Sequence, residues 1–155
     1  MNDDDTKSEV GEIELLSFRV GEQEYSVDIM SVREIRGWAK ATPLPHAPSF
    51  VRGVINLRGT VLPIVDLASR LGLPSGEDSN RNVIIVVHVD GQTLGLLVNA
   101  VSDILSIPLG EMQSPPELAA DVSRTFIRAL TIYEGRMIRV LNLEAVMPNK
   151  EGLAA

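Results

Sequence analysis

The sequence predicts a mainly β fold built from two lobes of short strands, and three observations support this prediction. Apolar and polar residues alternate in short runs, which are separated by turn-forming pairs such as those at 58–59 and 90–91. The pattern of the first half of the chain recurs in the second half. Two strands, 61–65 and 83–87, are apolar on both faces, which indicates burial against the other lobe or a partner. Four or five strands of this kind can close into a small barrel.

The bulk composition is that of an ordinary folded protein. The 155 residues suit one compact domain or two small lobes, and 45% are hydrophobic and 23% charged. The net charge of −7 argues against nucleic acid or anionic lipid as the main partner, since both need a basic face. The absence of cysteine fits a reducing cytoplasm. The acidic start does not resemble a signal peptide, and the apolar runs are too short to cross a bilayer.

We expect three parts along the chain. Residues 1–12 form a disordered acidic tail, because they carry almost no apolar side chains to bury. Residues 13–148 form one domain of two repeated lobes, approximately 13–72 and 83–148, and an exchange of strands between the lobes stays open. Residues 149–155 form a C-terminal tail. Nothing remains at either end to hold another domain, so we expect a stand-alone protein.

The first lobe begins with a hairpin of two half-buried strands, 16–20 and 25–29, joined by a turn at 21–22. Apolar residues then recur at every third position over 29–35, which predicts one or two helical turns. The stretch 41–48 contains three prolines and is predicted to be an ordered loop.

A second hairpin occupies 50–67, which reads FVRGVINLRGTVLPIVDL and turns at 58–59. Its end predicts a short helix over 66–71, with Asp66 as the N-cap. The polar stretch 73–81 that follows has the composition of a linker.

The same pattern starts again after the linker. The predicted elements are, in chain order, a hairpin of strands at 83–89 and 94–98, a helical segment at 100–105, a short helix at 117–122, a hairpin of strands at 126–131 and 137–141, and a helix from Asn142 to Met147.

Counting along the chain supports an internal duplication. Shifting residues 16–35 forward by 69 places Val20 on Val89 and Glu34 on Asp103. Shifting residues 50–67 forward by 76 superposes further matched residues, among them Phe50/Phe126, Arg52/Arg128, Gly59/Gly135 and Leu67/Leu143. The physical interpretation is two lobes, each with two hairpins and a short helical piece between them.

Few residues suggest catalysis. The two histidines, His46 and His88, have no companion at metal-ligand spacing, and no P-loop, GxSxG or GxGxxG is present. Asp66 is the one acid embedded in an apolar stretch. Its counterpart in the repeat is Asn142, another good N-cap, which favours capping over proton transfer. The sequence therefore predicts a protein that is not an enzyme, with no catalytic residue, metal ligand or cofactor.

Arg58 and Trp38 each leave two interpretations open. The counterpart of Arg58 is Glu134, so the charge is reversed while the following glycine is retained. Arg58 is either a solvated hairpin tip or an asymmetric contact made by one lobe only. Trp38 either fills the core or presents a partner-binding face. Asn56 and Leu57 are not repeated either, so the turn that they form with Arg58 is the candidate for function.

The motifs YSVDI at 25–29, VREIRG at 32–37, the whole of 50–67, and VSDIL at 101–105 together resemble the CheW family of bacterial chemotaxis coupling proteins. The resemblance covers about residues 13–148. It implies two small SH3-like five-stranded barrels with short helices. It also implies a cytoplasmic, non-catalytic adaptor that bridges the cytoplasmic tips of chemoreceptors to the regulatory domain of the histidine kinase CheA. Such adaptors are recruited to receptor arrays at the inner face of the membrane.

Site residues carried over by this resemblance remain expectations. Val32, Glu34 and Arg58 match family residues implicated in receptor and kinase coupling, and Gly53 and Ile104 match positions near the coupling surface. The resemblance places receptor helices in a groove between the lobes and kinase contacts at the barrel ends. Two alternatives stay open: the same adaptor in a twitching or developmental pathway, and a small-ligand-binding or hydrolytic barrel, which would need a pocket with convergent polar groups.

Overall fold

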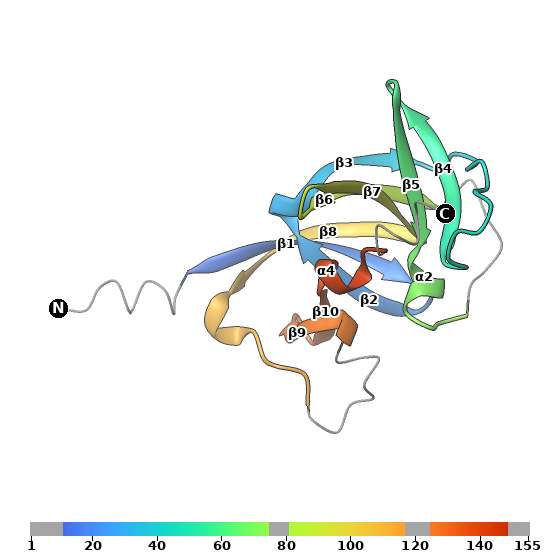
Figure 1. Ribbon diagram of the computed structural model, residues 1–155. Helices are drawn as coiled ribbons and strands as arrows, with labels where there is room; N and C mark the ends of the chain where they lie inside the picture. Colours follow the sequence, from blue (N-terminus) through green and yellow to red (C-terminus); the bar gives the residue numbers. More distant parts are fainter. Residues whose placement is uncertain (1–10, 75–80, 117–124, 149–155) are drawn as a thin grey trace.

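The computed structural model describes residues 11–74, 81–116 and 125–148 (Figure 1). These residues confirm the mainly β prediction, because they form ten strands and four short helical segments. The strands are β1 (Glu12–Val20), β2 (Gln23–Asp28), β3 (Val32–Gly37), β4 (Val51–Leu57), β5 (Thr60–Asp66), β6 (Val83–Val89), β7 (Gln92–Val98), β8 (Ala100–Pro108), β9 (Ile127–Tyr133) and β10 (Arg136–Leu141). The helical segments are η1 (Ile29–Ser31), α2 (Leu67–Arg70), η2 (Leu109–Glu111) and α4 (Leu143–Val146).

Several predictions concern residues outside these ranges. The helix predicted at 117–122 and the tail at 149–155 lie outside the described residues, as does most of the tail predicted over 1–12. Strand β1 already begins at Glu12, inside the predicted tail.

The strands form two five-stranded sheets. Sheet A has the order β8-β1-β2-β10-β9, and sheet B has the order β3-β6-β7-β5-β4. The two shifts found in the sequence map β1–β5 onto β6–β10, and this mapping converts one strand order into the other. The sheets therefore do not coincide with the contiguous lobes 13–72 and 83–148. The first hairpin of each half joins the second hairpin of the other half, through the parallel pairs β2–β10 and β5–β7.

Turn chemistry explains where the hairpins reverse. Arg58, Asp90 and Glu134 have φ of 51°, 51° and 50°, and each is followed by a glycine that also has positive φ. Two consecutive residues with positive φ make the tight turn whose twist matches that of antiparallel strands. The three predicted turns at 58–59, 90–91 and 134–135 are confirmed.

Two predicted helical segments are strands. Only η1 is helical in 29–35, where the Asp28 carboxylate accepts a hydrogen bond from the backbone N–H of Met30 at 2.9 Å. The chain then continues as β3, which pairs with β6 through a register shift between Val32 and Glu34. The apolar residues recur at every third position because a single 3₁₀ turn is followed by a β-bulge, and this spacing is the same as that of a longer helix. The segment 100–105 is likewise a strand and not a helix, because it belongs to β8, which pairs with β1.

Three apolar clusters form the core. The largest lies between the sheets and contains residues of both, including Phe18 and Val27 of sheet A and Ile85 of sheet B. A second cluster lies within sheet A and a third within sheet B. Ile84 and Val86 face the sheet B cluster while Ile85 and Val87 face the cluster between the sheets, which accounts for the two apolar faces of β6. In β5, by contrast, Val61 is 68% exposed.

The short helices secure the ends of the second hairpins. Asp66 is buried and caps α2 by accepting from the Ser69 N–H at 3.4 Å, as predicted. Its other oxygen accepts from Arg52 Nη2 at 2.7 Å, so Arg52 has an ion-pairing task in addition to packing. Asn142 begins α4 through its backbone, without a side-chain cap hydrogen bond.

Arg70, the last residue of α2, links α2 to α4. Its guanidinium donates from Nε and Nη2 to the carbonyl oxygens of Val146 and Ala145, at 3.1 and 2.9 Å. The same group lies over the rings of Phe50 and Phe126, at 4.3 and 4.9 Å from their centroids. These two phenylalanines are counterparts in the repeat, so Arg70 bridges equivalent points of the two halves.

Candidate functional site

The central feature of the candidate site is an ion pair between Glu34 and Arg58. Glu34 lies on β3, and Arg58 lies at the tip of the β4–β5 hairpin, which projects from the body of the molecule (Figure 1). Strands β3 and β4 are the two outer strands of sheet B. The ion pair therefore joins opposite edges of one curled sheet across the gap between them, which we call the seam.

Electrostatics keeps the Glu34 carboxylate charged. Its hydrogen bond from Arg58 is the largest cause that holds the pKa of Glu34 below its ordinary value, while burial acts in the opposite direction. Arg36 adds to the lowering, with Nη1 at 3.6 Å from the second carboxylate oxygen. In return, Glu34 raises the pKa of Arg58. The pair lies at the surface, where the Arg58 side chain is 69% exposed.

The other residues of the predicted turn shape the hairpin tip. The Asn56 side-chain oxygen accepts from the Gly59 N–H at 2.8 Å and so closes the turn. Leu57 is half-buried against the sheet B cluster, as is Trp38. The structure therefore supports a core role for Trp38, and it makes Asn56 and Leu57 supports for Arg58.

Gly53 is required by the backbone. Its φ is +141°, at a register shift in the β4–β5 ladder, and a Cβ built there would lie 2.2 Å from the carbonyl oxygen of Thr42. Thr42 and Val54 exchange backbone hydrogen bonds at 2.8 and 2.9 Å beside it. Gly53 thus allows the segment before β4 to lie directly against the hairpin.

The remaining two predicted site residues lie apart from the ion pair. Val32 is on β3 but packs against the cluster between the sheets. Ile104 is on β8 in sheet A, paired with Leu16, and is 59% exposed. The structure thus brings Glu34 and Arg58 together with Asn56 and Leu57, and it places Ile104 on a different sheet.

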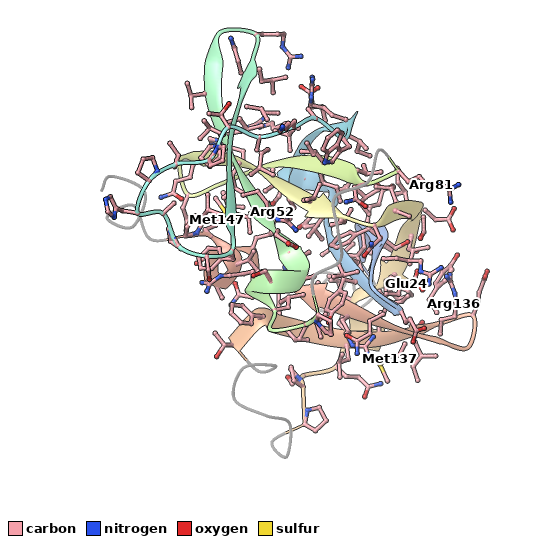
Figure 2. The ribbon with its side chains drawn as sticks, turned by 90° about the vertical axis from the view of Figure 1, so that its right-hand side faces the viewer. Glu24, Arg52, Arg81, Arg136, Met137 and Met147 are labelled. Atoms are coloured by element: carbon pink, nitrogen blue, oxygen red, sulfur yellow. The ribbon has the colours of Figure 1, made fainter. Side chains whose placement is uncertain are left out.

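Sheet A lacks this ion pair because the counterparts of Glu34 and Arg58 are Asp103 and Glu134, which are both acidic. Its hairpin tip is tied to β2 instead, through Arg136, whose Nη1 donates to both carboxylate oxygens of Glu24 at 3.0 and 3.1 Å (Figure 2). The asymmetric interpretation of Arg58 is therefore the one that the geometry supports.

The sequence interpretation missed Arg36. A strand assignment for 32–37 would have revealed it, because alternation places positions 34 and 36 on the same face.

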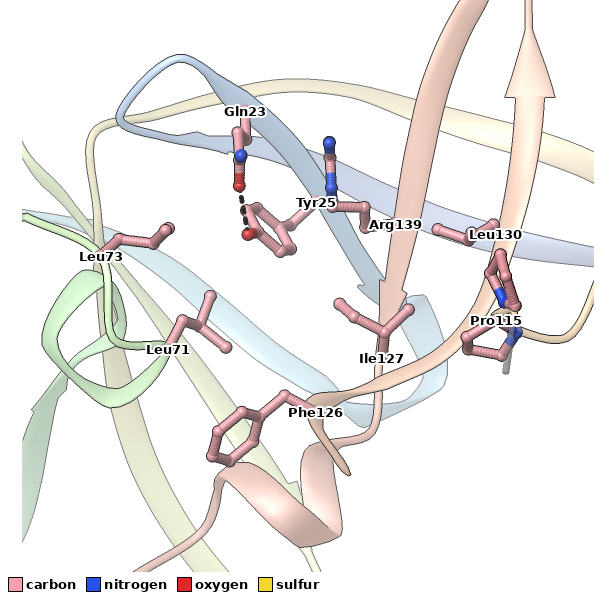
Figure 3. Close-up of a pocket in the computed structure, with 10 residues that line it drawn as sticks. Gln23, Tyr25, Leu71, Leu73, Pro115, Phe126, Ile127, Leu130 and Arg139 are labelled. Carbon is pink, nitrogen blue, oxygen red and sulfur yellow. Dashed lines mark hydrogen bonds between the residues drawn. The ribbon is translucent and has the colours of Figure 1, made fainter. Parts of the chain in front are cut away.

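A cavity of about 290 Å³ lies beside the core between the two sheets, where sheet A meets the segment that follows α2 (Figure 3). Leu71 and Leu73, which follow α2, form one side, and Tyr25, Phe126 and Arg139 are among the residues from sheet A and its approach. The Tyr25 hydroxyl donates to the Gln23 side-chain oxygen at 2.6 Å, and burial raises the pKa of Tyr25. The lining combines leucine, proline and aromatic side chains with the polar groups of Gln23, Tyr25 and Arg139.

No group of three or more potential metal ligands occurs among the described residues. No helix in the same ranges is long and apolar enough to cross a membrane.

The chain is similar to known proteins over most of its length. The model of the CheW-like domain matches residues 14–151. The chain is 54% identical over 142 residues to the chemotaxis protein CheW of Rhizobium meliloti (strain 1021), covering 92% of each chain. It is 50% identical over 145 residues to the probable chemotaxis protein CheW of Rhizobium etli, covering 94% of each. The crystal structure of the scaffolding protein TtCheW from Thermoanaerobacter tengcongensis superposes with a TM-score of 0.81 at 29% identity, covering 89% of this chain and 94% of that one.

These matches span nearly the whole chain and include both sheets. The paired sheets, the filled cores and the matched relatives lead to one assignment. The chain belongs to the CheW family of non-catalytic chemotaxis adaptor proteins.

Proposed function

We propose that this chain couples the cytoplasmic tips of chemoreceptors to the regulatory domain of the histidine kinase CheA. The observation that carries the proposal is the Glu34–Arg58 pair on the seam of sheet B. Both residues match family positions implicated in coupling, and the repeat shows that the fold does not require the pair, because in sheet A Asp103 keeps the negative charge while Glu134 replaces the arginine. The protein acts in the cytoplasm and joins receptor arrays at the inner face of the membrane.

The cavity between the sheets is the proposed seat for a receptor helix. Its lining includes the half-buried residues Leu73, Pro115 and Arg139. An amphipathic helix could lay its apolar face there and place an acidic residue against the guanidinium. The cavity is lined by sheet A, by the approach to β9 and by the segment that follows α2, which supports a helix-binding groove at this place.

The hairpin tips are the proposed kinase contacts. Val61 and Met137 occupy the same position in the two repeats and are 68% and 46% exposed. Ile132, which is paired with Met137, is 56% exposed. Exposed apolar side chains at the ends of two barrels suit contact with a partner domain.

The test measures binding of the full chain to the isolated kinase regulatory domain and to a receptor-tip fragment. We expect the unaltered chain to bind both and Arg58→Glu to lose most of its binding while remaining folded. The double variant Glu34→Arg, Arg58→Glu restores the ion pair with reversed polarity and serves as the folding control. If the unaltered chain binds neither partner, the proposed function is wrong.

The alternatives receive less support. Relatives at 54% and 50% identity are named as chemotaxis proteins, which favours chemotaxis over a twitching or developmental pathway. A ligand-binding or hydrolytic barrel would need convergent free polar groups. In the cavity between the sheets, Tyr25 and Gln23 instead bind one another.

A further inference from the structure

Glu34 and Arg36 lie on the same face of β3. Glu34 is opposite Val86 and Arg36 is opposite Ile84, and both of these partners belong to the buried cluster within sheet B. Residues directly opposite on paired strands project to the same side of a sheet. The carboxylate and the guanidinium therefore lie along the seam of sheet B, at the edge of its apolar interior.

Each oxygen of the Glu34 carboxylate faces its own cation. Arg58 Nη2 contacts Oε1, and Arg36 Nη1 lies 3.6 Å from Oε2. The Nε of Arg36 is buried and has no hydrogen-bond partner among the described residues. Because Arg36 Nη1 lies beside Oε2 and Arg58 Nη2 contacts Oε1, the three side chains form a continuous chain across the seam.

The repeat shows that this chain is specific to sheet B. The shift of 69 residues places Arg36 on Leu105, which is buried in the cluster of sheet A with an exposure of 2%. The counterparts of Arg36, Glu34 and Arg58 are thus Leu105, Asp103 and Glu134. A strand of this type accepts an apolar residue at the position of Arg36, so the folded frame does not require the arginine.

We propose that Arg36 is a positioning residue of the coupling site, which holds the second oxygen of Glu34 and thereby aims the first oxygen at Arg58 across the seam. The proposal rests on the proposed function of the Glu34–Arg58 pair. Without Arg36 the carboxylate keeps only one of its two cations and gains rotational freedom about its last torsion. The tip of the β4–β5 hairpin then loses a fixed anchor on β3.

The test uses Arg36→Leu, which copies the residue of sheet A, together with Arg36→Lys as the conservative variant. The matched control is Arg33→Gln, since Arg33 is an exposed arginine of the same strand, at the register shift between Val32 and Glu34. Two readouts are measured: the pKa of the Glu34 carboxyl by NMR titration, and the affinity for the kinase regulatory domain. The first readout needs no partner, and a merely structural role of Arg36 would not change it.

We expect Arg36→Leu to raise the pKa of Glu34 and to weaken binding about two- to fivefold, as suits one half-exposed ion pair. Arg36→Lys should restore the pKa in part, and Arg33→Gln should change neither readout. An unchanged Glu34 pKa in Arg36→Leu overturns the inference, whatever the affinity. If the leucine variant does not fold, the Glu34 pKa and the affinity are measured in Arg36→Gln instead, and an unchanged Glu34 pKa there overturns the inference in the same way.

Failure of the proposed function gives a different result. In that case the unaltered chain does not bind the kinase domain, while the NMR titration still decides whether Arg36 positions Glu34.

Discussion

Replacing Arg70 by methionine tests whether one side chain holds the two halves of the molecule together. Methionine keeps an apolar stem of similar length between the rings of Phe50 and Phe126, and it removes the guanidinium. The two carbonyl oxygens at the end of α4, those of Ala145 and Val146, then lose their donors. We expect a folded but clearly destabilised protein, with the contact between α2 and α4 weakened most.

The contacts of Arg70 set the size of the effect. Two hydrogen bonds from a charged donor contribute about 1.5 kcal/mol each. Two half-buried contacts with aromatic rings, at 4.3 and 4.9 Å, add about 0.5 to 1 kcal/mol each. Burial lowers the pKa of Arg70, so part of this gain is offset by desolvation of the cation. The net destabilisation expected for Arg70→Met is about 3 kcal/mol, at the upper end of ordinary substitutions.

The assay is urea unfolding followed by the fluorescence of Trp38, the single tryptophan of the chain. Arg33→Met controls for the loss of one exposed positive charge and should stay within about 0.5 kcal/mol of the unaltered protein. A double-mutant cycle of Arg70→Met with Phe126→Leu should show a coupling of about 0.5 to 1 kcal/mol. A loss below about 0.5 kcal/mol for Arg70→Met, with no coupling, refutes the idea that Arg70 joins the halves.

Three further predictions concern single positions. The Thr131 hydroxyl is buried with no hydrogen-bond partner among the described residues, so Thr131→Val should stabilise by about 1 kcal/mol in urea unfolding; destabilisation would reveal a partner for the hydroxyl. Gly53→Ala should destabilise by about 2 to 4 kcal/mol, because its Cβ would meet the Thr42 carbonyl, and an unchanged unfolding midpoint would contradict this. Because the folded pKa of Glu34 lies below its ordinary 4.5, the stability that its charge contributes is present above that pH and is lost as the pH falls through the folded pKa. The stability difference between the unaltered protein and Glu34→Gln should therefore shrink on acidification, and a constant difference would show that the charge does not matter.

Local features of the structure could be predicted because they depend on neighbouring residues. The hairpin reversals at 58–59, 90–91 and 134–135 follow from a residue that tolerates positive φ followed by glycine. The capping role of Asp66 followed from its comparison with Asn142 in the repeat. The spacing of Ile29, Val32 and Ile35 misled the prediction, since a 3₁₀ turn followed by a bulge has the same apolar spacing as a helix.

The candidate site could be predicted only in part. The repeat drew attention to the turn around Arg58, since Asn56, Leu57 and Arg58 are replaced by Ile132, Tyr133 and Glu134 in the second copy, with the charge reversed at the tip. It did not reveal that Asn56 serves the turn, that Gly53 serves the backbone, or that Ile104 lies on the other sheet. Arg36 was not singled out, because the helical turns predicted over 29–35 hid the strand alternation that places positions 34 and 36 on the same face.

The sequence by itself determined the class of fold, the hairpins, the duplication and the family, because alternation, turn chemistry and matched residues are all readable along one dimension. Only the tertiary structure decided which strands become neighbours. It joined the first hairpin of each half to the second hairpin of the other, and it closed the seam of sheet B with Glu34 and Arg58, which are 24 residues apart. The physical reason is that distant strands pair so as to bury both faces of a strand such as β6, one face in the cluster between the sheets and the other in the sheet B cluster. A local sequence pattern shows that both faces are apolar, but it does not show which distant strands cover them.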